Sequence, residues 1–242
     1  MANAGQLHVG FIPYYELSAE QGAGRAPTGF LPDVFALFCQ SAGIAFDKVR
    51  WRSMSWDSFA SHVKTHAIEL SISGTFITPE RAKAVAFTHP LFALGNGAAA
   101  RADDARFAGV TDVMQLDREG ITIAVVTGEQ SSEFVRAKFT KAKILPLDGP
   151  DLAAAPRAVE DGRADIAMSD QFILSRYIRE RPALKDLLLG KPFSVLPIAW
   201  AVDKANGALL AEINPILDAI IGGPEFAALK RKYAVVPFAP LS

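Results

Sequence analysis

Short apolar runs alternate with longer segments of helical periodicity in the N-terminal part of the chain. The segments "LHVGFI" (7–12) and "IELSIS" (68–73) each have the pattern of a strand, and 46–51 alternates between apolar and polar positions as a half-buried strand does. Between them, 31–42 and 56–66 carry apolar residues at helical spacing. This order predicts a β-α-β-α-β block.

The same alternation restarts after residue 94. The segment 95–102 has the pattern of an extended crossing segment, and 120–139 predicts a strand, a glycine turn and a helix. The segment 151–180 predicts a helix, a glycine stop, a strand and a second helix. A returning pair of strands is expected over 193–204, followed by two helices, the first of which Pro215 either kinks or starts.

Two residues mark the ends of the helix predicted over 31–42. Pro32 suits the first turn, where no backbone donor is needed, and Gly43 suits the position after the last turn. Cys39 lies on an apolar stretch of this helix and is the single cysteine of the chain, which excludes an internal disulfide. We expect a buried structural thiol rather than a nucleophile.

Strands that alternate with helices in this way indicate an α/β fold. The chain shows no fixed-period repeat and no low-complexity linker, so two lobes joined by strands fit better than independent domains. We expect lobe 1 to comprise 1–94 and 199–242 and lobe 2 to comprise 95–198, with two strands crossing between them as a hinge.

The composition fits a folded protein and limits its partners. Half of the 242 residues are apolar, and the formal net charge is −1. This near-neutral balance provides no basic stripe for nucleic acid, so a small or neutral partner is favoured over a polyanion. Each apolar run is interrupted before about 18 residues, the length that suggests a membrane-spanning helix, so we expect a soluble chain.

The N-terminus has neither the charged head nor the apolar segment of an export signal. Its residues Ala2-Asn3-Ala4 nevertheless have the small-x-small form that precedes signal cleavage. We therefore consider that this end is the scar of a removed export signal.

The histidines do not form a recognisable metal motif. His62 and His66 are four residues apart and share a face of a predicted helix, but "HVKTH" lacks the glutamate of a zinc hydrolase and a third ligand. His8 and His89 are isolated in the sequence. We predict a solvated helix face and no metal site.

The segment "VTGEQSS" places Gly128 between a predicted strand and a predicted helix. Such a turn directs free backbone N–H groups and the positive end of the helix toward the space above the sheet, where an anion can bind. An ordinary tight turn explains the glycine equally well. The chain has no phosphate-binding lysine motif and no serine in a glycine-flanked elbow, so neither nucleotide binding nor serine catalysis is indicated.

Aromatic residues follow two of the predicted strands. Tyr14 and Tyr15 come after the first strand, and Trp56 begins the second predicted helix. Both places lie at the carboxyl ends of strands, where open α/β sheets bind their ligands. Core packing is an equally good explanation of these residues taken alone.

Five motifs in order along the chain give a more specific indication. They are "PTGFLPDVFALFCQSAGI", "ITPERAKAVAFTHPLF", "VTGEQSSEF", "EDGRADIAMSD" and "FAALKRKY". Together they resemble the periplasmic amino-acid-binding proteins of ABC importers, the extracellular solute-binding proteins of the polar amino-acid class. The resemblance implies a type II periplasmic-binding-protein fold, a periplasmic monomer that delivers a small ligand to a membrane ABC permease, and no cofactor.

The resemblance also assigns roles to individual residues. Arg81 matches the arginine that binds the ligand's α-carboxylate, although a surface salt bridge would explain it if the motif stood alone. Asp170 matches the aspartate that accepts the amino group, and Gln130 matches a carboxylate-binding residue beside the Gly128 turn. The remaining implied ligand contacts are Tyr14, Tyr15, Trp56, Ser73, Gly74, Thr75 and Phe76.

Two departures from the family pattern bear on the ligand. Phe76 stands where relatives carry a serine or threonine, and Ile12 stands where binders of basic amino acids carry an acid. These changes argue against arginine, lysine or histidine. They favour an apolar, aromatic or otherwise unusual side chain, and a ligand outside the standard amino acids stays open.

Two other functions are compatible with the same scaffold. Some relatives are dehydratases of cyclic acids, and such chemistry needs a carboxylic acid with a raised pKa, for which Glu129 is the candidate. The chain could also be the sensor domain of a membrane receptor. We expect a binding protein and no enzyme.

Overall fold

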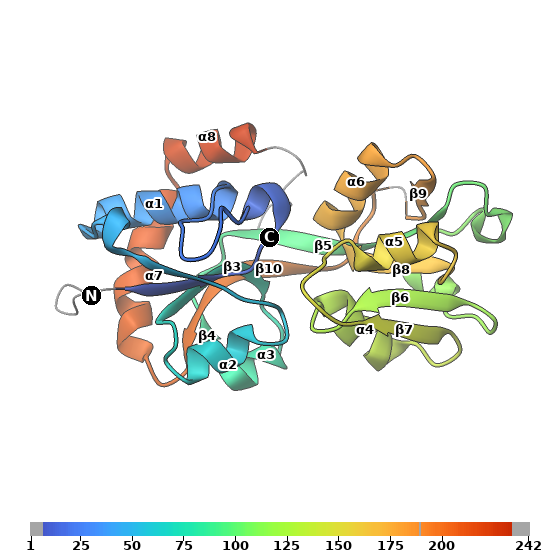
Figure 1. Cartoon of the computed structure of the whole chain (residues 1–242), viewed down its shortest axis with the longest axis horizontal. Helices are drawn as coiled ribbons and strands as arrows, with labels where there is room; N and C mark the ends of the chain where they lie inside the picture. Colours follow the sequence, from blue (N-terminus) through green and yellow to red (C-terminus); the bar gives the residue numbers. More distant parts are fainter. Residues whose placement is uncertain (1–6, 189, 234–242) are drawn as a thin grey trace. The chain divides into compact units, whose positions relative to one another are not determined.

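The computed structural model describes residues 7–188 and 190–233, and the chain forms two compact units. Unit 1 contains the chain up to Ala93 and from Leu196 onward, and unit 2 is Leu94–Val195. The chain passes between the units twice, within β5 (Phe92–Arg101) and within β10 (Phe193–Asp203), as Figure 1 shows.

Unit 1 contains a mixed sheet in the order β2-β1-β3-β10, with β4 also paired to β10. Its further strands are β1 (His8–Phe11), β2 (Arg50–Ser53), β3 (Leu70–Phe76) and β4 (Val85–Phe87). Strand β1 runs parallel to both β2 and β3, whereas β10 is antiparallel to β3. The carboxyl ends of β1 and β3 therefore open at the same edge of the sheet.

The helical elements of unit 1 include α1, which packs on this sheet through aromatic side chains. They are η1 (Tyr15–Leu17), α1 (Phe30–Ala42), η2 (Phe46–Lys48), α2 (Phe59–Lys64), α3 (Arg81–Ala84), α7 (Gly207–Ile221) and α8 (Pro224–Lys232). Phe35 and Phe38 of α1 both meet the ring of Trp200 on β10 edge-on. Gly43 ends α1 in the left-handed conformation, with φ 67°, as its position after the last turn predicts.

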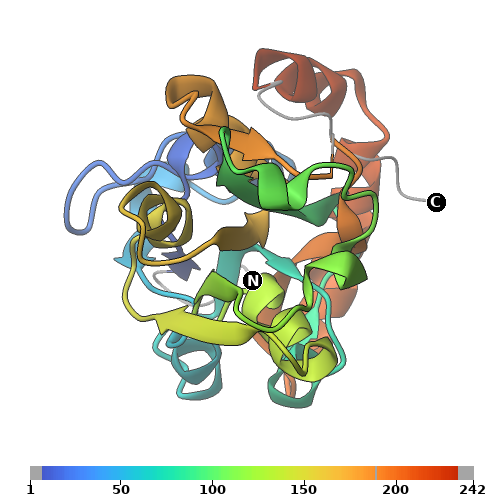
Figure 2. The same cartoon turned by 90° about the vertical axis from the view of Figure 1, so that its right-hand side faces the viewer.

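In unit 2 the strands follow the order β5-β8-β6-β7, with β9 paired to β5. Its further elements are η3 (Ala105–Phe107), η4 (Val113–Leu116), β6 (Thr122–Val126), α4 (Gln130–Lys138), β7 (Lys143–Leu147), α5 (Ala154–Glu160), β8 (Ile166–Asp170), α6 (Gln171–Glu180) and β9 (Leu184–Asp186). Strands β6 and β8 run parallel, so their carboxyl ends also share one edge. Strand β7, yellow-green in Figure 2, pairs with β6 on one side only.

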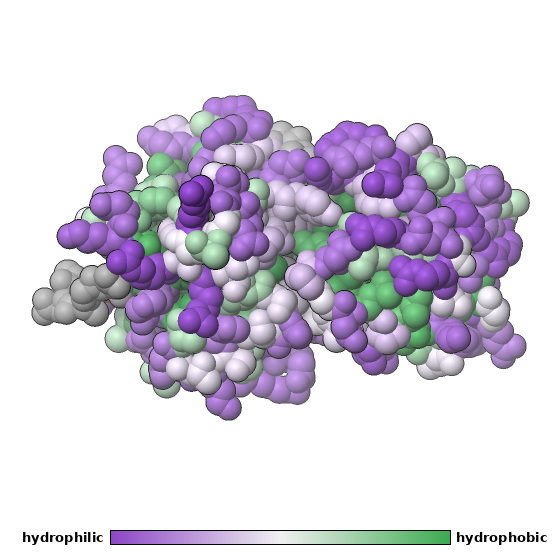
Figure 3. Space-filling view, viewed as in Figure 1, coloured by the Kyte–Doolittle hydropathy of each residue, from purple (hydrophilic) through white to green (hydrophobic). Residues whose placement is uncertain are grey.

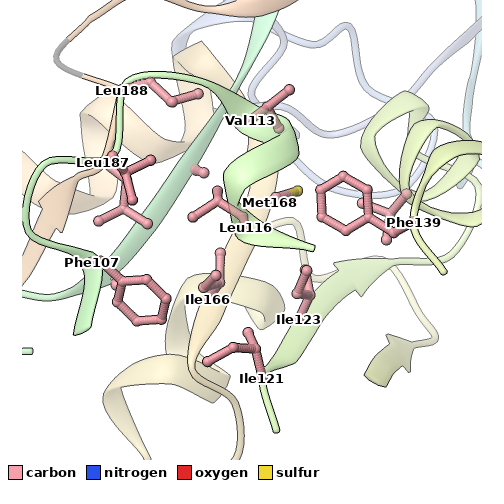
Figure 4. Packing of buried hydrophobic residues seen from close by; sticks show 14 of the residues in the cluster. Phe107, Val113, Leu116, Ile121, Ile123, Phe139, Ile166, Met168, Leu187 and Leu188 are labelled. Carbon is pink, nitrogen blue, oxygen red and sulfur yellow. The ribbon is translucent and has the colours of Figure 1, made fainter. Parts of the chain in front are cut away.

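The core of unit 2 lies on the face of its sheet that α4 covers. Ile123 on β6, Ile166 and Met168 on β8, and Val135 on α4 are fully buried together with Phe139 beside them. Figure 4 shows their aliphatic side chains converging with those of the η4 turn and the segment after β9. This packing holds β6 and β8 in place, and with them the carboxyl ends of both strands. Hydrophilic side chains predominate on the face of each unit shown in Figure 3.

Several element predictions need correction. The strand expected over 46–51 begins only at Arg50, because Phe46–Lys48 forms a short 3-10 turn and pairing with β1 starts at Arg50. The helix expected over 56–66 is limited to Phe59–Lys64, since the residues before it form a turn. The strand pair expected over 193–204 is the single strand β10.

Smaller predictions also meet the structure. Pro215 lies inside α7 and does not start it. Cys39 is buried, and burial raises the pKa of its thiol to about 12, as expected of a structural thiol. Within the described ranges, no helix has both the length and the apolar character needed to cross a membrane. The proposed cleavage scar at Ala2-Asn3-Ala4 lies outside the described residues.

Candidate functional site

Arg81 is the central residue at the carboxyl edge of β1 and β3. It begins α3, its backbone N–H donates to Thr78 Oγ1 (3.2 Å), and its side chain is only 7% exposed. The guanidinium carbon lies 5.3 Å from the ring centre of Trp56 and 5.9 Å from that of Phe59. Nη1 also donates to the carbonyl of Phe76 at 3.5 Å. Two aromatic faces and a carbonyl thus orient a charge that cannot be titrated.

The predicted aromatic residues gather around this arginine. The rings of Tyr14 and Trp56 meet edge-on, with centroids 6.3 Å apart. Trp56 does not begin a helix as expected. It lies in a turn that is closed by the hydrogen bond from Ser55 N–H to Ser58 Oγ (3.1 Å). Tyr15 has φ 46°, a left-handed conformation that costs a tyrosine energy and that surrounding structure must maintain.

Strand β3 contains a left-handed residue, Gly74, between the predicted oxygen acceptors. Gly74 has φ 66°, and a Cβ atom there would lie 2.9 Å from Leu31 Cδ1, so both conformation and space require glycine. Ser73 Oγ pairs with Ser71 Oγ at 2.9 Å. Thr75 Oγ1 is buried and has no hydrogen-bond partner in the structure. The two acceptors therefore differ, because only that of Ser73 is already bonded.

The two residues that depart from the family pattern are apolar components of unit 1. Ile12 is buried with Met54, Phe59 and Val63, against which Trp56 also packs. Phe76 ends β3 and is buried as well. An acidic or hydroxyl side chain at these positions would lie among apolar groups.

A second group of candidate residues lies at the carboxyl edge of β6 and β8 in unit 2. Helix α4 begins at Gln130 after the Gly128 turn, and α6 begins at Gln171 directly after β8. Gly128 has φ 86°, which favours glycine in this turn. Two helix N-termini, each with backbone N–H groups not used inside the helix, therefore lie at one edge of the sheet.

Asp170 is the N-cap of α6. Its Oδ1 accepts a hydrogen bond from Ile173 N–H at 3.0 Å, and the residue is 6% exposed. The cap explains in structural terms why an acidic residue occurs here. A carboxylate can accept several hydrogen bonds, so capping leaves chemical capacity for an ammonium group.

Glu129 is a second buried carboxylate at this edge. Its Oε2 accepts hydrogen bonds from Ser169 Oγ (2.9 Å) and Ser131 Oγ (3.2 Å). Hydroxyl donors stabilise the ionised form of a carboxylate. Both donors bind Oε2, and Glu129 is only 6% exposed.

The side chain of Gln130, which is expected to bind the ligand, is hydrogen-bonded to another side chain of unit 2. Its Oε1 accepts a hydrogen bond from Nδ2 of Asn96 on β5, and both side chains are buried. The sequence analysis missed Asn96. The signal that could have found it is the run Gly95-Asn96-Gly97, because glycines inside a strand indicate close approach of other groups.

The predicted site residues thus form two groups. Tyr14, Trp56 and Arg81 are in direct contact in unit 1, and the β3 residues lie at the end of the neighbouring strand. Gln130 and Asp170 share an edge of unit 2. Among residues 7–188 and 190–233, no three His, Cys, Asp or Glu side chains are grouped to hold a metal ion. His62 Nδ1 instead lies 2.9 Å from the carbonyl of Ser58.

Comparisons with known proteins identify the family. Residues 7–236 match the family of bacterial extracellular solute-binding proteins, family 3. The chain is 24% identical to the ABC transporter arginine-binding protein 1 of Escherichia coli K12, over 90% of this chain and 86% of that protein. It is 28% identical to the ABC transporter glutamine-binding protein GlnH of Bacillus subtilis 168, over 69% of this chain and 58% of that protein.

A solved structure gives a similar result for the fold. An ancestral amino-acid-binding protein, described as a precursor of cyclohexadienyl dehydratase, superposes with a TM-score of 0.81 at 26% identity, over 95% of each chain. The resemblance to amino-acid-binding proteins of ABC importers and the type II periplasmic-binding-protein fold are therefore confirmed. The chain belongs to family 3 of the bacterial extracellular solute-binding proteins.

Proposed function

We propose that this protein binds a free amino acid with an uncharged side chain in the periplasm and delivers it to an ABC permease. Family membership and the names of two relatives, an arginine-binding and a glutamine-binding protein, support the ligand class. The residues of the two candidate groups support how the ligand is held.

Arg81 binds the ligand's α-carboxylate. The observation that carries this assignment is a nearly buried guanidinium that lies over the rings of Trp56 and Phe59 at the carboxyl edge of parallel strands. A guanidinium matches a carboxylate with two parallel hydrogen bonds, and stacking reduces the freedom that binding must remove. The hydroxyl of Thr75 adds a further polar contact from β3.

Asp170 binds the ligand's α-ammonium group from unit 2. Its cap on α6 fixes the carboxylate, so little side-chain freedom is lost on binding. A zwitterion bound by residues of both units stabilises the state in which both contact it, which is how a ligand closes a hinged protein. The proposed closure thus requires both charges of the ligand.

The ligand's side chain is uncharged because its surroundings in unit 1 are apolar or already positive. Ile12 and Phe76 provide no acid to pair with a cation. The face of Trp56, which would otherwise attract a cation, already carries the guanidinium of Arg81 at 5.3 Å. A second cation there would be repelled.

A thermal-shift screen tests this function. Bound ligand raises the melting temperature with the logarithm of its concentration over Kd, so the screen ranks ligands directly. The panel contains the standard amino acids, together with the amide and the desamino analogue of each one that binds. We expect an uncharged amino acid to rank first and both analogues to give no shift. A first rank for arginine or lysine would contradict the uncharged side chain, and no shift with any amino acid would contradict the function.

We also propose that the protein binds its ligand without transforming it. The relation to a dehydratase precursor makes dehydration the alternative, with Glu129 as proton donor. The names of the curated relatives, an arginine-binding and a glutamine-binding protein, support binding without transformation. Incubation with prephenate, followed by the absorbance of an aromatic product, distinguishes the two functions. Recovery of unchanged substrate supports binding alone, and enzyme-dependent product formation would overturn it.

A further inference from the structure

The amide pair of Asn96 and Gln130 carries an inference beyond the assigned site residues. Asn96 lies on β5 directly opposite Asp170 of β8 in the antiparallel register. Further along the same pair of strands, Ala98 and Met168 face each other and belong to the core under α4. Because side chains alternate along a strand, Asn96 and Asp170 point to the same face as this core. Directly opposed residues have Cβ atoms about 5 Å apart.

The glycines that flank Asn96 close the other face of β5. A Cβ atom at Gly95 would collide with Pro192, and one at Gly97 would lie 3.1 Å from Leu174 Cδ1. The strand is therefore pressed against its neighbours on that side, which keeps Asn96 directed toward α4. Its side chain is 1% exposed, so every polar atom it leaves unmatched is costly.

One atom of Asn96 is unmatched. Nδ2 donates to Gln130 Oε1, whereas the buried Oδ1 makes no hydrogen bond in the structure. This pairing fixes the polarity of both amides. Asn96 presents an acceptor beside the carboxylate of Asp170, and Gln130, having used its oxygen, presents its NH₂ group as a donor.

We propose that Asn96 is a ligand-binding residue that shares the ligand's ammonium group with Asp170, while the Gln130 amide donates to the ligand's carboxylate. This inference rests on the proposed function and narrows its ligand class to primary amines. A primary ammonium has three N–H donors and can satisfy both acceptors in several orientations, whereas an N-methyl ammonium keeps two donors, must use both of them in one orientation and adds bulk. The amide pair therefore selects free amino acids against their N-methylated forms.

Calorimetry on the full chain tests the proposal with three probes, L-leucine, L-phenylalanine and L-glutamine, each with its N-methyl form. Asn96→Leu keeps the branched shape of the side chain and removes the acceptor. We expect it to lower the affinity for the primary amino acid roughly tenfold or more. The affinity for the N-methyl form should fall less, so the variant should prefer the primary amine by a smaller factor than the wild type does. Asn214→Leu, at an asparagine whose Oδ1 accepts from His89 N–H in unit 1, is the matched control and should stay within about twofold.

The outcomes separate this inference from the function on which it rests. If the wild type binds none of the three probes, the measurement is repeated with the amino acid that ranks first in the thermal-shift panel, and binding of no panel member would contradict the proposed function. If it binds and Asn96→Leu stays within about twofold of wild type, the function stands and the role of Asn96 is overturned. Should Asn96→Leu fail to fold, Gln130→Met removes the partner that orients Asn96 and should weaken binding several-fold, and unchanged affinity would again overturn the proposal. Where both variants fold, the double variant should bind more weakly than Asn96→Leu alone but by less than the sum of the two losses, because Gln130 both orients Asn96 and donates to the ligand's carboxylate. Fully additive losses would show that Gln130 does not orient Asn96.

Discussion

The two units place opposite chemistry at the same topological position. In unit 1 the carboxyl edge of β1 and β3 presents a guanidinium packed among aromatic rings. In unit 2 the carboxyl edge of β6 and β8 presents carboxylates held by hydroxyl groups and a helix N-terminus. Topology thus determines where these charged side chains lie, and the residues placed there determine which charge each edge presents.

The two edges also hold their charges by different means. Arg81 is oriented mainly by stacking, which does not depend on pH, because arginine stays protonated. The carboxylates of unit 2 are oriented by hydrogen bonds that they accept from serine hydroxyls and a backbone N–H group. Perturbations of hydrogen bonding should therefore affect unit 2 first, and perturbations of packing should affect unit 1 first.

The largest effect is expected from Asp170→Asn. This change keeps an N-cap side chain on α6 but removes the charge, so affinity for the amino acid should fall roughly 100-fold, about 2.7 kcal/mol, with little loss of stability. Asp170→Ala should lose the same affinity and, in addition, about 1 kcal/mol of folding stability from the missing cap. Calorimetry and urea unfolding measure the two quantities. Equal affinity of Asp170→Asn and wild type would show that the residue is only a cap.

A smaller effect is expected at Gly74, the left-handed residue within β3. Gly74→Ala should destabilise unit 1 by about 1–2 kcal/mol, because the alanine adopts a left-handed φ and its Cβ crowds Leu31. Gly43→Ala is the matched control, since Gly43 has nearly the same φ but open space around the added atom. Chemical unfolding compares the two variants. If both cost the same, crowding at Leu31 contributes nothing and β3 is looser than described.

The smallest effect concerns pH and the charged network of unit 2. The Arg106 side chain, hydrogen-bonded to Asp104, lowers the pKa of Asp104 to about 2, and Arg106 also bonds Asp165 at 2.6 Å. Because the folded pKa lies below the unfolded one, this stabilisation is present above about pH 4 and is lost as the pH falls toward 2. Arg106 is half exposed, so the contribution should be below about 1 kcal/mol.

Melting temperatures of wild type and Arg106→Gln from pH 7 to pH 2 check this prediction. The difference between them should be constant down to about pH 4 and should shrink below it. Arg163→Gln, which removes a longer and more exposed pair with Asp161, should show no such dependence. A wild-type advantage that persisted unchanged to pH 2 would contradict the assigned cause.

Helix ends that depend on a single glycine or proline could be predicted from the sequence. The end of α1 at Gly43 and the start of α8 at Pro224 follow from backbone preferences of glycine and proline. Strand β7 was not predicted from the sequence. It contains Pro146, its apolar residues are only half-buried, and it forms because β6 pairs with it. Pairing of this kind depends on a distant segment and leaves little local trace.

The candidate site was predicted to different depths in the two units. Arg81, Trp56 and Tyr14 could be proposed from motifs, and the structure brings them into contact. Asn96 could not, because its importance arises from the register between β5 and β8, which places it opposite Asp170. Roughly seventy residues separate Asn96 from Asp170. A single sequence does not specify the register between strands so far apart.

The affinity of Arg81→Gln for an amino acid and for its carboxamide tests the central claim most directly. The claim is that this guanidinium reads the carboxylate of the ligand. With the amino acid ranked first in the thermal-shift screen, wild type should prefer the acid over the amide by roughly 100-fold, and Arg81→Gln should reduce this preference to below about tenfold. A preference that is as large in Arg81→Gln as in wild type would contradict the claim.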